Sequence, residues 1–216
     1  MRQVQKGKPL VMVFTHSDFD HILGYGAFDP NFVIAHHNFF KNPKKDKILQ
    51  EIHDFDAKMY IKRDYELKYP EKGIEITSDN QVVSFGNTNL HFYPALGHTD
   101  DSIFLIIEPL KLLLVGDYLS NIEFPFIYYS LDEYRKTVDK ISLILERHPI
   151  QTMIPGHGDI ATSVDAIKTR LMLDNYYLEY FIKFYFDFEN FLKYYPFPDG
   201  LHDEHLANLR KWFMSE

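Results

Sequence analysis

Residues 10–21 read LVMVFTHSDFDH, a bulky apolar run followed directly by a polar cluster. The run Leu10–Phe14 is typical of a strand that is buried on both faces. The cluster behind it holds four potential metal ligands, which are His16, Asp18, Asp20 and His21. Because α/β sheets build their sites where strands end in loops, this stretch predicts an α/β protein with a site directly after the strand.

Three further motifs each place one histidine or aspartate beside a glycine. They are Gly97-His98-Thr99, Gly116-Asp117 and Pro155-Gly156-His157-Gly158. Glycine lets the backbone turn sharply or approach a site closely. Any one of these motifs is a weak signal, but their joint order after probable strands predicts that they form one shared metal-binding site. Imidazole and carboxylate suit Zn²⁺, iron and Mn²⁺, and a set without thiolates disfavours a purely structural zinc.

Hydrophobic periodicity places regular elements between these motifs. Strands are expected at residues 32–35, 73–77, 81–85, 89–93, 102–108, 111–115 and 151–154. Helices are expected at residues 46–62, from 131 to before 149, in one long run from about 163 to 192, and near 204–213. Ser130 followed by Glu133 is a capping-box signature for the second of these helices.

Composition limits the possible partners and the cellular compartment. The net charge of −8 argues against a nucleic-acid partner, because such proteins carry basic patches. The apolar runs are too short to cross a bilayer, so no membrane partner is expected. The chain contains no cysteine, which fits a reducing cytoplasm. We therefore expect a cytoplasmic protein that acts on a small-molecule substrate.

The ordered motifs resemble the metallo-β-lactamase superfamily over about residues 10–162. The resemblance implies a four-layered αββα sandwich in one domain, residues 1–216. Its core would span about 10–162, and a helical, aromatic-rich C-terminal extension would span about 163–216.

The same resemblance implies a dinuclear metal centre, with zinc first and iron or manganese as alternatives. One ion would bind His16, Asp18 and His98, and the other would bind Asp20, His21 and His157. Asp117 would bridge both ions. A hydroxide between them would be the nucleophile, and Asp20 would be a catalytic residue able to accept a proton.

Two features depart from the family pattern. Asp18 stands where the family's HxHxDH motif has its second histidine, and a carboxylate there shifts the metal preference towards iron or manganese. Only fifteen residues precede His16, so the N-terminal part of the sandwich is expected to be incomplete. Either the sequence is truncated, or a partner subunit, such as a second copy in a homodimer, covers the exposed sheet.

Three classes of function fit these motifs. The leading prediction is a metal-dependent hydrolase that acts on an ester, thioester, lactone or phosphoester. The alternatives are a di-iron oxidoreductase-like member of the family and a non-catalytic, degenerate metal-binding scaffold. Outside the motifs, we interpret the pair His36-His37 as non-ligating, and His91 and His148 as packing or surface residues. We interpret Asp100 and Asp101 as turn residues, with hydrogen bonding to a metal-bound histidine as the alternative.

Overall fold

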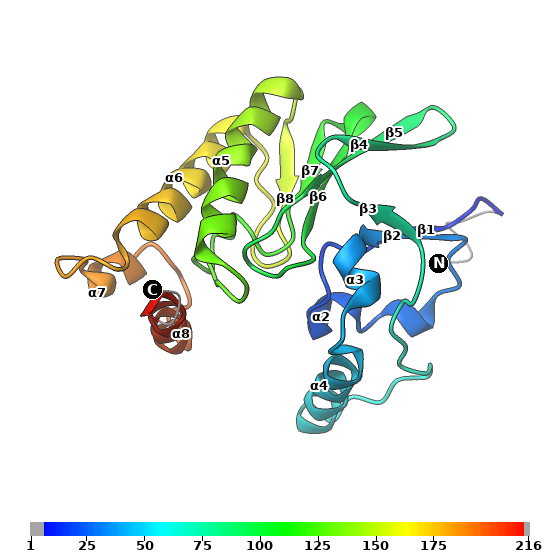
Figure 1. The fold of residues 1–216 in the computed structure, drawn as a ribbon, viewed down its shortest axis with the longest axis horizontal. Coiled ribbons are helices and arrows are strands. Elements are labelled where there is room, and N and C mark those ends of the chain that lie inside the picture. The colour runs from blue at the N-terminus through cyan, green and yellow to red at the C-terminus, as the bar shows by residue number, and fades with distance from the viewer. Residues whose placement is uncertain (1–6, 214–216) are drawn as a thin grey trace.

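Two β-sheets stand between two groups of helices in this computed structural model, which describes residues 7–213 (Figure 1). The first sheet is parallel, with strand order β1 (Val11–Val13), β2 (Phe32–His36) and β3 (Ile74–Ile76). The second sheet has the order β4 (Gln81–Phe85), β5 (Thr88–Pro94), β6 (Ile103–Ile107), β7 (Leu112–Leu114) and β8 (Thr152–Ile154). Its strands are antiparallel except for the parallel pair β7 and β8.

Three hydrophobic clusters separate four layers. Alternate residues of β2 divide between two clusters, because successive side chains of a strand point to opposite faces. Val33 packs with the N-terminal helices, whereas Ile34 packs with Leu105 of the second sheet. On β6 the same alternation places Leu105 between the sheets and Phe104 against the C-terminal helices. The predicted four-layered αββα sandwich is therefore confirmed.

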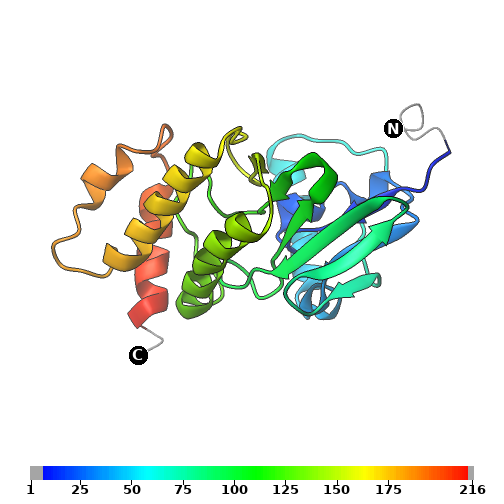
Figure 2. The same cartoon turned by 90° about the horizontal axis from the view of Figure 1, so that it is seen from above.

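The helices cover the outer face of each sheet. The first sheet is covered by α2 (Phe19–Ile22), η1 (Tyr25–Ala27), α3 (His37–Lys41) and α4 (Lys45–Lys58). Helices α5 (Leu131–Arg147) and α6 (Val164–Tyr180) run side by side over the second sheet (Figure 2). They are followed by α7 (Phe188–Leu192) and α8 (Leu201–Phe213). A short turn, η2 (Glu108–Leu110), connects β6 and β7.

Helix α5 begins where its capping signal predicts. The hydroxyl of Ser130 accepts a hydrogen bond from the backbone N–H of Glu133 at 3.3 Å. This bond satisfies one of the donors that the first turn of a helix leaves free. Helix α6 is capped in the same way by Ser163, which accepts from the N–H of Ala166 at 3.1 Å.

The predicted long helix of residues 163–192 is wrong beyond Tyr180, where α6 ends. Its apolar stripe stays buried as far as Phe181, but Tyr185 is 60% exposed. The Asp187 side chain accepts a hydrogen bond from the N–H of Asn190 and starts the separate helix α7. The break lets α7 fold back, so that Phe191 stacks on Tyr177 of α6. Among the described residues, no helix is long and apolar enough to span a membrane.

Candidate metal centre

All seven residues that the motifs single out lie together at one edge of the sandwich. His16 follows β1, His98 follows β5, Asp117 follows β7 and His157 follows β8; Asp18, Asp20 and His21 lie at the start of or within α2. The C-terminal ends of β7 and β8 meet because these strands are parallel. A hydrogen bond of 2.8 Å from the N–H of Ile103 to the carbonyl of Thr15 ties the end of β1 to the second sheet.

Four of these side chains form a first group. His16, Asp18, His98 and Asp117 each offer one ligand atom, and these atoms lie within 4.8 Å of one another. Oδ2 of Asp18 lies 3.6 Å from Nε2 of His16 and 3.2 Å from Nε2 of His98. The carboxylate of Asp18 therefore lies among the imidazoles of this group.

The remaining three side chains form a second group beside the first. Asp20, His21 and His157 also present ligand atoms within 4.8 Å of one another. Oδ2 of Asp20 lies 3.1 Å from Nε2 of His157 and 3.5 Å from Nε2 of His21. The resemblance to the metallo-β-lactamase superfamily implies the same division into two groups.

The carboxylate of Asp117 joins the two groups. Its Oδ2 lies 3.5 Å from His16 and 3.4 Å from His98, the histidines of the first group. Its Oδ1 lies 3.0 Å from Nε2 of His21, and its Oδ2 lies 3.5 Å from Nε2 of His157. Asp117 is thus the one side chain of the seven that approaches all four histidines.

The donor set fits divalent cations. Nε2 of His16 and Oδ1 of Asp117 are buried without a hydrogen-bond partner, although buried polar atoms normally have one. Both atoms point into the cluster, where a cation would satisfy them. Four imidazoles and three carboxylates without a thiolate match Zn²⁺, iron or Mn²⁺. The residues present therefore fit a metal centre.

The electrostatics of the cluster favour positive charge at its middle. Burial alone would raise the pKa of Asp117, but the four imidazoles around it, those of His157, His16, His21 and His98, outweigh burial and hold this pKa well below its usual range. Burial alone would lower the pKa of His98, yet Asp117 and Asp18 raise it to about 10. Each carboxylate thus stabilises a cationic neighbour, and a metal ion can take the place of the protons.

Sequence patterns did not reveal the groups that orient His98. Its Nδ1–H donates to the carbonyl of Phe126 at 2.8 Å, so Nε2 is the ring nitrogen that faces Asp18 and Asp117. The backbone N–H of His98 donates to the hydroxyl of Tyr118, which itself donates to the carbonyl of Ala95. Tyr118 therefore holds the backbone of His98 in place from a buried position. Its position next to Asp117 in the sequence does not predict this role.

The loop after β7 and the loop after β8 are tied to each other. Asn121 accepts from the N–H of Asp159 at 2.7 Å and donates to the Asp159 carboxylate at 3.0 Å. Nη1 of Arg170, on α6, donates to the carbonyls of Leu119 and Asp159 at 3.2 and 2.8 Å. Because these loops carry Asp117 and His157, Arg170 and Asn121 set the distance between two members of the centre.

Asp101 braces the centre from another side, whereas the pair His36-His37 lies outside it. The buried Asp101 accepts from the hydroxyl of Thr99 at 2.7 Å and from the N–H of Ser17 at 3.4 Å, so it links two ligand-bearing loops. His36 accepts from the N–H of Asn38 as the cap of α3. His37 pairs with Glu75 at 2.6 Å.

A cleft of about 880 Å³ opens over the centre. Its lining includes Asp18, Asp20, His98, Asp117 and His157. The rim adds both charges and aromatic rings: Lys44, Lys47, Glu51, Asp54, Glu123, Tyr128, Tyr129 and Lys211. None of the aromatic residues of 176–195 lines this cleft. A small molecule therefore has access to both ligand groups.

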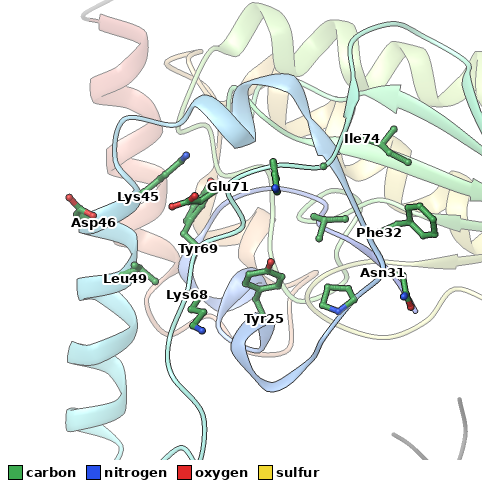
Figure 3. Close-up of a pocket in the computed structure, with 14 residues that line it drawn as sticks. Tyr25, Asn31, Phe32, Lys45, Asp46, Leu49, Lys68, Tyr69, Glu71 and Ile74 are labelled. Atoms are coloured by element: carbon green, nitrogen blue, oxygen red, sulfur yellow. The ribbon is translucent and has the colours of Figure 1, made fainter. Parts of the chain in front are cut away.

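A second hollow lies away from the centre, between α4 and the segment 68–74 (Figure 3). None of the seven residues lines it. Nζ of Lys45, at its wall, already donates to the carbonyl of Phe40 at 2.6 Å and lies over the ring of Tyr69. The cleft over the metal centre is therefore the better candidate for a substrate site.

Comparison with known proteins decides the family. The sequence profile of the metallo-β-lactamase superfamily matches residues 2–172. The chain belongs to this superfamily. Members of the metallo-β-lactamase superfamily typically bind divalent metals, which agrees with the two ligand groups at the sheet edge.

Individual members of the superfamily are distant relatives. Human acyl-coenzyme A thioesterase MBLAC2 is 24% identical over 165 residues, which cover 69% of this chain and 56% of the relative. The chain thus spans about half the length of this curated relative, and the same holds for the bovine protein of that name.

Two solved structures share the fold. The stereoselective inverting sec-alkylsulfatase Pisa1 from Pseudomonas sp. superposes with a TM-score of 0.64 at 14% identity, covering 84% of this chain and 34% of that one. An archaeal metallo-β-lactamase superfamily protein from Sulfolobus tokodaii has a TM-score of 0.57 at 16% identity, covering 96% and 81%.

Proposed function

We propose that this chain is a metal-dependent hydrolase that cleaves an ester-type bond in a small molecule, with thioesters as the first class to test. One observation carries the proposal, namely that Asp117 joins two three-residue ligand groups at the floor of an open cleft. Two adjacent cation positions beneath a cleft are the arrangement that two-metal hydrolases require.

The seven residues take distinct parts in this proposal. His16, Asp18 and His98 hold one ion, Asp20, His21 and His157 hold the other, and Asp117 bridges them. When bound, two divalent cations lower the pKa of water, polarise the scissile carbonyl or phosphoryl oxygen and stabilise the charge that develops.

The residues of the chain supply orientation and proton transfer. His98 is fixed by the Phe126 carbonyl, so its Nε2 stays aimed at the first position. The Asp20 side chain is 32% exposed and lines the cleft, so one of its oxygens remains accessible to a substrate. We assign Asp20 the role of accepting a proton during hydrolysis, in addition to holding an ion.

The substrate class rests on the curated relatives. The human and bovine proteins are named acyl-coenzyme A thioesterases, which supports a thioester. The rim of the cleft carries lysines, such as Lys44 and Lys211, alongside the acidic Glu51 and Asp54. This mixed charge does not select between thioesters and the other acyl or phosphoryl esters, so substrates of all these classes belong in the test.

A second candidate function is oxidoreductase chemistry at two iron ions. The observation that favours it is Asp18, whose carboxylate lies 3.2 Å from His98. A carboxylate at this position favours iron or manganese, whereas a histidine would favour zinc. Stoichiometric iron with a redox-dependent absorption spectrum would support this candidate, and two zinc ions with esterase or thioesterase activity would exclude it.

The test combines metal analysis with hydrolysis assays on the full chain purified without chelator. We expect about two metals per chain and metal-dependent cleavage of at least one thioester or ester. Asp117→Ala should empty both positions and abolish hydrolysis, whereas His36→Ala, which removes a buried histidine outside the cluster, should keep both ions. Equal metal loss in the two variants, or two metals without hydrolysis of any tested class, would contradict the proposal.

A further inference from the structure

A second cluster of metal-ligand side chains lies at the far end of α5. His91, Glu108 and His148 each offer one ligand atom, and these atoms lie within 4.8 Å of one another. The start of α5 lies beside the principal centre, because the N–H of Ser130 donates to the carbonyl of Gly97. A helix of this length spans about 25 Å, so His148, at the other end, belongs to a separate place in the molecule.

The sheet register brings the first two residues to one face. His91 on β5 is paired directly with Ile106 on β6. Glu108 is two residues beyond Ile106 and therefore a diagonal neighbour of His91 on the same side of the sheet. Ile106 packs against the C-terminal helices, so this is the face that α5 covers. The third member of the cluster is the buried His148, which is the C-cap of the helix α5 that covers this face.

A chain of hydrogen bonds determines where the imidazole protons lie. Oδ1 of Asn80 can only accept, and it contacts Nδ1 of His91 at 2.9 Å and the hydroxyl of Tyr93 at 3.0 Å. His91 therefore carries its proton on Nδ1, and Tyr93 gives its proton to Asn80. The Tyr93 oxygen then accepts from Nε2–H of His148, which lies 2.8 Å away. As a result, Nε2 of His91 and Nδ1 of His148 both keep lone pairs.

The lone pair of His91 has no partner in the structure. Its Nε2 is buried without a hydrogen bond and lies 3.4 Å from Oε2 of Glu108. A lone pair that faces a carboxylate at this distance is repelled unless a metal ion or a proton lies between them.

We propose that His91, Glu108 and His148 form a second metal site, for one divalent transition-metal ion such as Zn²⁺. Two imidazoles and one carboxylate are a common zinc set, and Asn80 and Tyr93 act as the outer hydrogen-bond partners that fix the imidazoles. The Glu108 side chain is 44% exposed, so solvent can reach the remaining coordination position. Arg147 lies 3.5 Å from the Tyr93 hydroxyl, and its charge makes this site weaker than the principal centre.

Such an ion would link three segments that are remote in sequence. It would hold the turn η2 and strand β5 to the end of α5. The role is structural, because no cleft that we describe is lined by all three ligands.

The experiment is a zinc titration of the chelator-treated full chain, with bound zinc counted by elemental analysis after gel filtration. Glu108→Gln keeps the size of an exposed side chain but removes its charge. We expect this variant to bind one zinc fewer than the wild type, or to bind that zinc at least ~10-fold more weakly. Hydrolysis should not change, because Glu108 is remote from the principal centre.

Glu75→Gln is the matched control, because Glu75 also pairs with a histidine, His37, but belongs to no three-ligand group. It should bind as many zinc ions as the wild type. His91→Gln is a second variant and should lose the same equivalent as Glu108→Gln. Equal zinc binding by the wild type and Glu108→Gln would overturn the proposal and leave an ordinary ion pair between His91 and Glu108. This comparison does not depend on how many ions the principal centre holds.

Discussion

Oδ1 of Asp117 lies 3.0 Å from Nε2 of His21, the shortest approach between this carboxylate and the four histidines around it. The contact joins the loop after β7 to helix α2, and so it joins the two halves of the sandwich. Gly156 packs directly against it. A side chain at Gly156 would overlap Oδ1 of Asp117 and would lie 2.6 Å from Cε1 of His21.

Gly156→Ala is therefore expected to displace both side chains. We expect metal content to fall below one ion per chain, with overpacking that costs about 1–3 kcal/mol of unfolding free energy. Elemental analysis and denaturant unfolding measure the two effects. Gly24→Ala is the control, because a Cβ there meets its nearest neighbour at an ordinary 3.9 Å. Retention of two ions by Gly156→Ala would show that the contact can relax.

Asp18→His is expected to change which metal binds. The substitution replaces a hard carboxylate with an imidazole, so the first position should gain preference for zinc over iron and manganese. We expect a several-fold rise in the zinc-to-iron ratio when the protein is loaded from an equimolar mixture. Asp54→His is the control, since it adds a histidine to the lining of the same cleft but not to either ligand group. An equal rise in both variants would argue against ligation by Asp18.

Arg170→Met is expected to loosen the two loops that carry Asp117 and His157. The arginine donates to the carbonyls of Leu119 and Asp159, and both acceptors lose this partner in the variant. We expect metal affinity to fall about 10-fold and unfolding free energy to fall by about 1–3 kcal/mol. Lys168→Met removes an exposed charge from the same helix and should have neither effect. Metal affinity that stays at the wild-type value in Arg170→Met would contradict a positioning role.

The buried Asp174 should make the free energy of unfolding depend on pH. Burial raises its pKa to about 8, although its side chain accepts from the N–H of Leu119 and feels the charge of Arg170. Between about pH 4 and pH 8 the folded protein therefore keeps a proton that the unfolded chain has released. The stability that this proton contributes is complete below pH 4 and is lost as the pH rises towards 8.

Asp174→Asn removes that titration and keeps an acceptor for Leu119. The variant should gain stability relative to the wild type as the pH rises from 5 to 7.5, by at most about 1.4 kcal/mol per pH unit. Urea unfolding at a series of pH values measures this difference. A difference between the two proteins that does not vary with pH would mean that Asp174 is ionised in the folded state.

Much of this architecture is determined locally by the sequence. Apolar runs and turn residues predicted the strands, and the eight strands of the structure lie within or beside the expected ranges. The Ser130 cap predicted the start of α5. The ligand types at the ends of strands predicted that these seven residues come together, because parallel strand ends and the loops behind them meet at one edge of a sheet.

The features that only the tertiary structure determined depend on contacts between segments far apart in the chain. Periodicity continued the helix past Tyr180, but packing of Phe191 on Tyr177 required a break there. His91 and His148 looked like packing or surface residues, and only the pairing of β5 with β6 beneath the end of α5 brought them to Glu108. The supporting roles of Tyr118 and Arg170 were equally hidden. Local sequence encodes the period and the ends of elements, whereas the partner of a buried polar atom is set by the packing of the whole chain.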